Sequence, residues 1–134
     1  MRVDEYQWKT QDTAAPYLVA AKEFLASSRT ASLVDTEGVT DAEKFLRIAY
    51  LAGKLNGEAG EVAEEVFKAF RDDLGELTDV RLDAITKELG DVMWYISQLC
   101  NELDLKLADV LALNIAKLQA RKSIGNLQGS GSDR

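Results

Sequence analysis

Two long stretches of the sequence, separated by a short polar segment, repeat apolar residues at the spacing of one helix face. The first stretch ends at about Asp72 and the second begins at about Asp79. Such a stripe predicts that each stretch forms a helix. The apolar face of each helix must then be covered by other helices or by another subunit. The stripes consist of Ile48, Ala52, Leu55, Ala59, Val62, Val66 and Phe70, and of Ile85, Leu89, Val92, Ile96, Leu99 and Leu103. The sequence therefore predicts an all-α helical bundle.

The segments before the first stripe predict one more helix and a polar connection. A helical region is expected from about Asp4 to Ser27, with a break or kink at Pro16, the single proline of the chain. The polar segment Ser28–Thr40 follows. Thr40 is the expected N-cap of the long helix that runs to Asp72, because a hydroxyl side chain satisfies free N–H groups at a helix start.

The C-terminal half predicts a turn and two helices, which gives a bundle of four to five helices. The turn is expected at Asp73–Thr78 and the helix after it at about Asp79–Leu103. The last helix is expected from about Lys106 to Ile124, with Gly125 as the residue that closes it.

Length and composition predict a single domain over residues 1–125, followed by a flexible Gly/Ser-rich tail over residues 126–134. The net charge of −7 disfavours binding to nucleic acid or to anionic membranes. The lone cysteine, Cys100, cannot form an intramolecular disulfide, and no apolar run approaches the ~20 residues of a membrane span. We therefore expect a cytoplasmic protein that binds neither nucleic acid nor membranes.

The chain contains no histidine. This excludes zinc sites with histidine ligands, histidine general bases and di-iron sites built on Glu-x-x-His. Without histidine, a general base in this protein has to be a carboxylate or a hydroxide bound to a metal.

A short internal repeat places acidic residues beside both apolar stripes. Residues 58–62 and 88–92 share the pattern Glu-x-Gly-acid-Val. Residues three apart project from nearly the same side of a helix, so each copy presents two carboxylates together. Gly60 and Gly90 occupy matched mid-helix positions, where a glycine costs about 1 kcal/mol relative to alanine. We expect another helix or a ligand to approach closely at both.

The turn between the two helices predicts how these acids meet. If the helices form an antiparallel hairpin, residues equally far from the turn lie at one level. Glu58 then lies level with Asp91, and Glu61 level with Glu88. Four unpaired carboxylates this close would repel one another, which raises some of their pKa values.

A divalent cation would remove that repulsion. Mg²⁺ is the expected ion and Mn²⁺ is possible, because both prefer oxygen ligands. The predicted ligands are Glu58, Glu61, Glu88 and Asp91, and Glu65 is either a further acid next to the metal or a solvated one. The alternative is that all these acids form a solvated helix face.

At this point the sequence resembles a known family, the MazG-like members of the all-α nucleoside triphosphate pyrophosphohydrolases. The resemblance rests on Glu-x-x-Glu at residues 58–61, Glu-x-x-Asp at residues 88–91, and the segment 114–122 before a Gly-rich tail. It implies Mg²⁺-dependent hydrolysis between the α- and β-phosphates of a nucleotide, giving a monophosphate and pyrophosphate. It also implies a homodimer or homotetramer in which the bundle is completed across subunits.

Four residues of the last predicted helix are candidates for substrate binding. Lys117 and Arg121 are four residues apart, Asn114 lies one turn earlier, and Lys122 follows. In an acidic protein this polar face would suit phosphate oxygens, so Lys117 and Arg121 are also candidate catalytic residues. The alternative is that these cations only interact with the C-terminal end of the helix dipole.

Two further residues lie within one turn of the acids. Lys54 would contact phosphate or simply pair with Glu58. Tyr95, one turn after Asp91, would contact the sugar or base or else pack in the core.

The predicted reaction is attack by water on a phosphorus, with the metal polarising phosphate oxygens and cations neutralising the departing pyrophosphate. The base is either a carboxylate, for which Glu61 is preferred, or a hydroxide on the metal. The competing hypothesis is a non-catalytic acidic helical module that binds a partner helix through its exposed apolar stripe.

Overall fold

The computed structural model describes residues 1–13 and 36–123, which form four helices and no strand. The helices are α1 (Val3–Gln11), α3 (Thr36–Asp72), α4 (Asp79–Glu102) and α5 (Leu107–Ser123). None of the described helices is both long enough and apolar enough to cross a membrane. The predicted all-α fold is confirmed.

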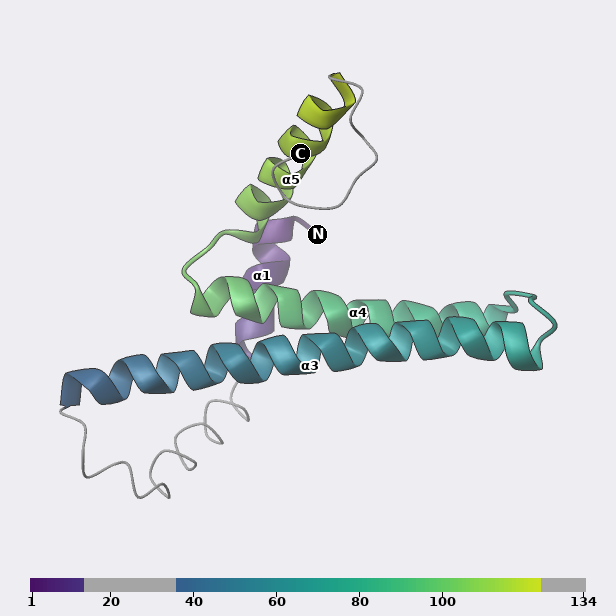
Figure 1. Cartoon of the computed structure of the whole chain (residues 1–134), viewed down its shortest axis with the longest axis horizontal. Helices are drawn as coiled ribbons and strands as arrows, with labels where there is room; N and C mark the ends of the chain where they lie inside the picture. Colours follow the sequence, from purple (N-terminus) through teal and green to yellow (C-terminus); the bar gives the residue numbers. More distant parts are fainter. Residues whose placement is uncertain (14–35, 124–134) are drawn as a thin grey trace.

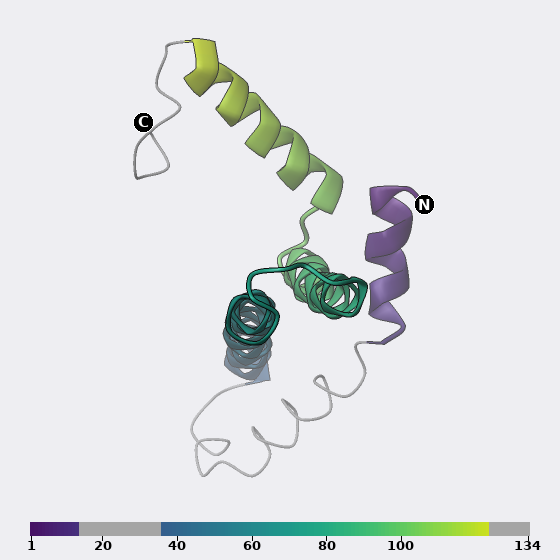
Figure 2. The ribbon, with the colours of Figure 1, turned by 90° about the vertical axis from the view of Figure 1, so that its right-hand side faces the viewer.

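The helices α3 and α4 form an antiparallel hairpin and lie side by side along most of α4 (Figure 1). Figure 2 views this pair nearly end on, with α1 packed on α4 on the side away from α3. Helix α5 begins near the first residues of α1 and extends away from the hairpin (Figures 1 and 2). The hairpin is thus the frame on which α1 packs, and α5 is attached beside α1.

The α3–α4 turn lies where the sequence predicted it. The N–H of Gly75 donates to the carbonyl of Ala69 at 3.0 Å, which closes α3 while Gly75 adopts a φ of +83°. The hydroxyl of Thr78 caps α4 by accepting from the N–H of Arg81 at 3.3 Å. These local bonds fix the length of the turn, and therefore the register of the two helices.

Two predicted boundaries were wrong. Helix α3 begins at Thr36, so Thr40 lies inside the helix and is not its N-cap. The glycine before it, Gly38, does not interrupt the helix, because one glycine costs only about 1 kcal/mol. Helix α1 ends at Gln11, before Pro16, where the hydroxyls of Thr10 and Thr13 bond to backbone carbonyls one turn earlier. Such bonds compete with helix continuation.

Several other predictions fall outside the described residues. These are the remainder of the first helical region, the polar segment up to residue 35, the closing residue Gly125 and the tail 126–134 with the domain boundary before it.

The largest fully buried side chain of the hairpin, that of Leu51, lies away from the turn, and the small Ala69 is buried next to the turn. Leu51 is fully buried and packs against Trp94, Tyr95 and Leu99 of α4. Cys100 is a buried free thiol, as expected, and burial raises its pKa.

Toward the turn, much of the predicted apolar stripe remains exposed. Val66 and Phe70 of α3 and Leu89 of α4 all face outward in the single chain. The described residues therefore do not close a bundle on their own. Completion of the bundle by another subunit stays a prediction.

Helix α1 is joined to the rest of the fold by polar contacts. The hydroxyls of Thr10 and Ser97 share a buried hydrogen bond of 2.9 Å. The side chain of Gln7 donates to the carbonyl of Leu105 at 2.8 Å and accepts from the N–H of Leu107 at 2.8 Å. Gln7 thereby ties α1 to the turn between α4 and α5 and to the first residue of α5.

We expect Gly75→Ala to lower the free energy of unfolding by about 1 kcal/mol, because its φ of +83° is disfavoured for residues with a Cβ. Gly53→Ala is the matched control. Gly53 lies inside α3 with open space around its Cβ position, so alanine should stabilise the protein by up to about 1 kcal/mol. Urea unfolding measures both. A Gly75→Ala protein as stable as the wild type would show that the turn does not need this backbone conformation.

Candidate metal centre

The register of the hairpin brings three predicted ligands together. Carboxylate oxygens of Glu58, Glu88 and Asp91 all lie within 4.8 Å of one another. Glu58 is buried, Glu88 is half-buried and Asp91 is exposed, so the group opens from the helix interface toward solvent. We call these three residues the carboxylate cluster.

Glu61, the fourth predicted ligand, lies close to the cluster without being part of it. It is exposed on α3, and its charge is one of those that act on Glu88. The pKa of Glu88 is raised, first by burial and then by the negative charges of Glu61, Asp91 and Glu58. The predicted repulsion among the acids is therefore present in the folded chain.

The cluster fits a divalent cation by its donor chemistry. Three carboxylate oxygens within 4.8 Å of one another provide hard oxygen ligands. Burial and then the neighbouring negative charges raise the pKa of Glu88, and a divalent cation would neutralise those charges. Both properties suit Mg²⁺ or Mn²⁺.

Glu65, the other candidate acid, is held by two cations. Its carboxylate accepts from Lys68 at 2.6 Å and from Arg81 at 2.7 Å, and these bonds lower its pKa. Arg81 also binds Asp73 at 3.0 Å, so it joins α3, the turn and α4. Glu65 adds to the negative potential at Glu88, but its two oxygens are already engaged.

Lys54 and Tyr95 lie beside the carboxylate cluster and contact each other. The ammonium of Lys54 is 3.1 Å from Glu58 and 5.8 Å from the centroid of the Tyr95 ring. The Tyr95 ring packs edge-on against Trp94 at a centroid distance of 4.8 Å. The structure shows the Lys54–Glu58 ion pair and the packing of Tyr95, and contact of either residue with a nucleotide stays a prediction.

The four candidates on α5 are not brought to the cluster within the single chain. Asn114, Lys117 and Lys122 are exposed and Arg121 is half-buried, on a helix that extends away from the hairpin (Figures 1 and 2). Lys117 follows Leu107, the anchored first residue of α5, by ten positions, or about 15 Å at the rise of an α-helix.

No part of the described chain approaches the matched glycines. A Cβ built on Gly60 or Gly90 would meet nothing within 4 Å beyond its own helix and chain neighbours. The expected close approach by another helix is therefore not made by residues 1–13 or 36–123, and a ligand or another helix stays the predicted occupant.

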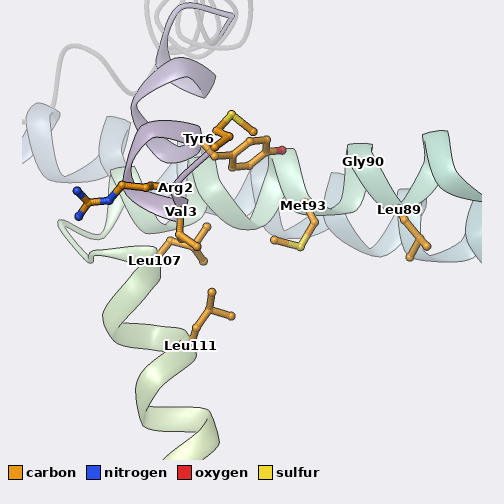
Figure 3. A pocket seen from close by; sticks show the side chains of 9 residues that line it. Arg2, Val3, Tyr6, Leu89, Gly90, Met93, Leu107 and Leu111 are labelled. Atoms are coloured by element: carbon orange, nitrogen blue, oxygen red, sulfur yellow. The ribbon is translucent and has the colours of Figure 1, made fainter.

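A cavity that the sequence did not predict lies on the side of α4 that α1 covers. Its volume is about 440 Å³, and α1, α4 and α5 all contribute to its lining (Figure 3). Tyr6 reaches over it, and burial followed by the charge of Asp91 raises the pKa of this phenol. The sequence around Tyr6 gives no sign that this residue lines a cavity near Asp91. Its position becomes clear only from the packing of α1 on α4.

The chain matches a family profile and a known protein. Residues 48–124 match the profile of the MazG nucleotide pyrophosphohydrolase domain, and this range contains the whole carboxylate cluster. The chain is also 45% identical to the Gene 37 protein of Mycobacterium phage L5 over 97 residues, which is 72% of this chain and 85% of that protein. No solved structure matches the chain significantly.

We expect Glu88→Gln to stabilise the metal-free protein at neutral pH. Because the folded state raises the pKa of Glu88, the protonated carboxyl favours folding, and stability is lost as the pH rises through its titration. A neutral glutamine avoids that loss, so the difference from wild type should shrink as the pH falls. Urea unfolding in chelator at several pH values measures this.

Asp83→Asn is the control, because Asp83 pairs with Lys87 on the exposed side of α4 and should gain nothing from neutralisation. Equal or lower stability of Glu88→Gln at neutral pH would contradict the repulsion inferred for the cluster.

Proposed function

We propose, since the chain belongs to the MazG nucleotide pyrophosphohydrolase family, that it hydrolyses the α–β phosphoanhydride bond of (deoxy)nucleoside triphosphates or related nucleotides. The products are a nucleoside monophosphate and pyrophosphate. The observation that carries the proposal is the meeting of Glu58, Glu88 and Asp91 oxygens within 4.8 Å at the hairpin interface. We further propose that the reaction takes place in the cytoplasm.

Glu58, Glu88 and Asp91, together with Glu61, would hold Mg²⁺, and Mn²⁺ would also suit them. Mg²⁺ supplies positive charge to phosphate oxygens and makes water more acidic when it is bound. The half-buried position of Glu88 and the burial of Glu58 fix these two side chains, whereas Asp91 lies on the solvent side, where the triphosphate would enter.

Glu61 is the proposed base. Its carboxylate is exposed, and its charge acts on Glu88. In the proposed reaction it would accept a proton from water as the water oxygen attacks phosphorus. The bond from phosphorus to the bridging oxygen breaks, and the electron pair leaves with pyrophosphate.

Lys117 and Arg121 are proposed to neutralise the departing pyrophosphate, with Asn114 and Lys122 as further substrate contacts. Helix α5 directs them away from the cluster of their own chain. We therefore propose a dimer or tetramer in which α5 of one subunit reaches the cluster of another. The apolar side chains that remain exposed on α3, α4 and α5 supply surface for this assembly.

A second candidate function is a non-catalytic acidic module that binds a partner helix. It is favoured by the apolar side chains that surround the α3–α4 turn, including Phe67, Phe70 and Val80, all of them largely exposed. The two functions differ in whether nucleotides are hydrolysed and in whether the carboxylate cluster is required.

We expect Asp91→Asn to abolish hydrolysis while the fold is kept, because it removes a charged ligand at an exposed position. The wild type and this variant should be incubated with Mg²⁺ and a panel of standard and modified nucleotides, with pyrophosphate and orthophosphate measured separately. Circular dichroism checks the fold, and Asp83→Asn is the control on the same helix. A fully active Asp91→Asn protein, or orthophosphate as the sole product, would contradict the proposal.

We expect Arg121→Ala to lower kcat/KM by about 10- to 1000-fold without changing the Mg²⁺ affinity, as for loss of one charged contact to a transition state. Mixing Arg121→Ala with Asp91→Asn protein should restore part of the activity, because mixed oligomers would combine an intact cluster with an intact α5. Wild-type kcat/KM in Arg121→Ala would show that the cation only interacts with its own helix. No recovery on mixing would contradict the sharing of sites between subunits.

A further inference from the structure

Lys54 is held by two groups of different chemistry. Its ammonium forms an ion pair with Glu58 at 3.1 Å and lies 5.8 Å from the centroid of the Tyr95 ring. An aromatic face at this distance attracts a cation without forming a directional bond. The lysine can therefore change its anionic partner while it stays over the ring.

The two members of the ion pair differ in exposure. The side chain of Glu58 is 11% exposed, whereas that of Lys54 is 44% exposed. A carboxylate with so little access to water needs a cation beside it. The lysine, by contrast, can turn toward solvent at little cost.

Tyr95 is held in place from two sides. Its ring contacts Trp94 edge-on at 4.8 Å and packs on the buried Leu51. The indole N–H of Trp94 donates to the hydroxyl of Thr13 at 2.6 Å, just beyond α1. The ring beside the Lys54 ammonium is thus held by the core and, through Trp94, by Thr13.

We propose that Lys54 is an exchangeable counter-ion: it neutralises Glu58 in the free protein, releases it when a divalent cation binds, and then contacts the phosphates of the nucleotide. Tyr95 is the positioning residue that keeps the ammonium beside the carboxylate cluster after this exchange. The phosphate contact rests on the proposed function, whereas the competition for Glu58 does not.

An ordinary surface ion pair on a helix would not behave this way. Lys87 and Asp83 have the same four-residue spacing and a distance of 2.7 Å, but both side chains are about two-thirds exposed. Water solvates either of them when the pair opens, so this pair has little influence on other charges. It therefore provides a matched control on α4.

The first test measures the affinity of the nucleotide-free full-length protein for Mn²⁺ and Mg²⁺ by calorimetry. Lys54→Met should bind both ions about three- to tenfold more tightly than wild type, because a competing positive charge next to Glu58 is removed. Lys87→Met should bind them as the wild type does. Unchanged or weaker binding by Lys54→Met would overturn the proposal.

The second test separates the ring from the rest of Tyr95. Tyr95→Leu should raise the KM for the nucleotide about three- to tenfold with little change in kcat, and Tyr95→Phe should keep the wild-type KM because the aromatic face remains. An equal loss in both variants would overturn the positioning role. If Tyr95→Leu does not fold, the KM values of Lys54→Met and Tyr95→Phe are compared instead. A raised KM in Lys54→Met together with a wild-type KM in Tyr95→Phe supports the positioning role of the ring. Any other pair of KM values contradicts it.

The two tests also distinguish this inference from the proposed function. Metal affinity is measured without nucleotide, so tighter binding by Lys54→Met would stand even if no nucleotide were hydrolysed. If the wild type is an active pyrophosphohydrolase and Lys54→Met binds metal like wild type, the inference alone is wrong.

Discussion

The antiparallel register of α3 and α4 is the constraint on which the rest of the structure depends. Each residue advances a helix by about 1.5 Å and rotates it by about 100°, so a slip of one residue would turn Glu88 or Asp91 away from Glu58. Two features hold the register at the turn end. The turn has a fixed length through Gly75 and the cap of Thr78, and Arg81 binds Glu65 across the helix pair.

The acids along this interface differ in whether a cation pairs with them. Glu65 and Glu58 each have a cation within 3.1 Å, and both are largely removed from water. In the described part of the chain, Glu88 and Asp91 form no ion pair. Repulsion is thus relieved at Glu58 within the carboxylate cluster and at Glu65 beside it, but it is left in place at Glu88 and Asp91. This arrangement suits a divalent cation, because full internal pairing would lower the affinity for the ion.

The sequence predicted those parts of the structure that follow from local spacing. Apolar periodicity predicted the two long helices, and the turn residues predicted that Asp79 would begin α4. Equal distance from the turn predicted that Glu58 and Asp91 would meet. These arguments need only helix geometry and a short connection. The predicted start of α3 was wrong. A cap at Thr40 and a further turn of helix before it stabilise the chain by similar free energies, so the local sequence alone does not decide where the helix begins.

The direction of α5 could not be predicted, and the structure shows why. It depends on contacts between segments far apart in sequence, chiefly the bonds of Gln7 to the α4–α5 turn and the burial of Leu107.

Beyond that anchor, α5 exposes Leu113 and Ile115, and Leu111 and Leu118 are only partly covered. A helix of 17 residues has little stability of its own in water, so these side chains need a surface that the described part of this chain does not supply. Where Lys117 and Arg121 act is therefore set by whatever covers α5, and less by the sequence of the helix that carries them.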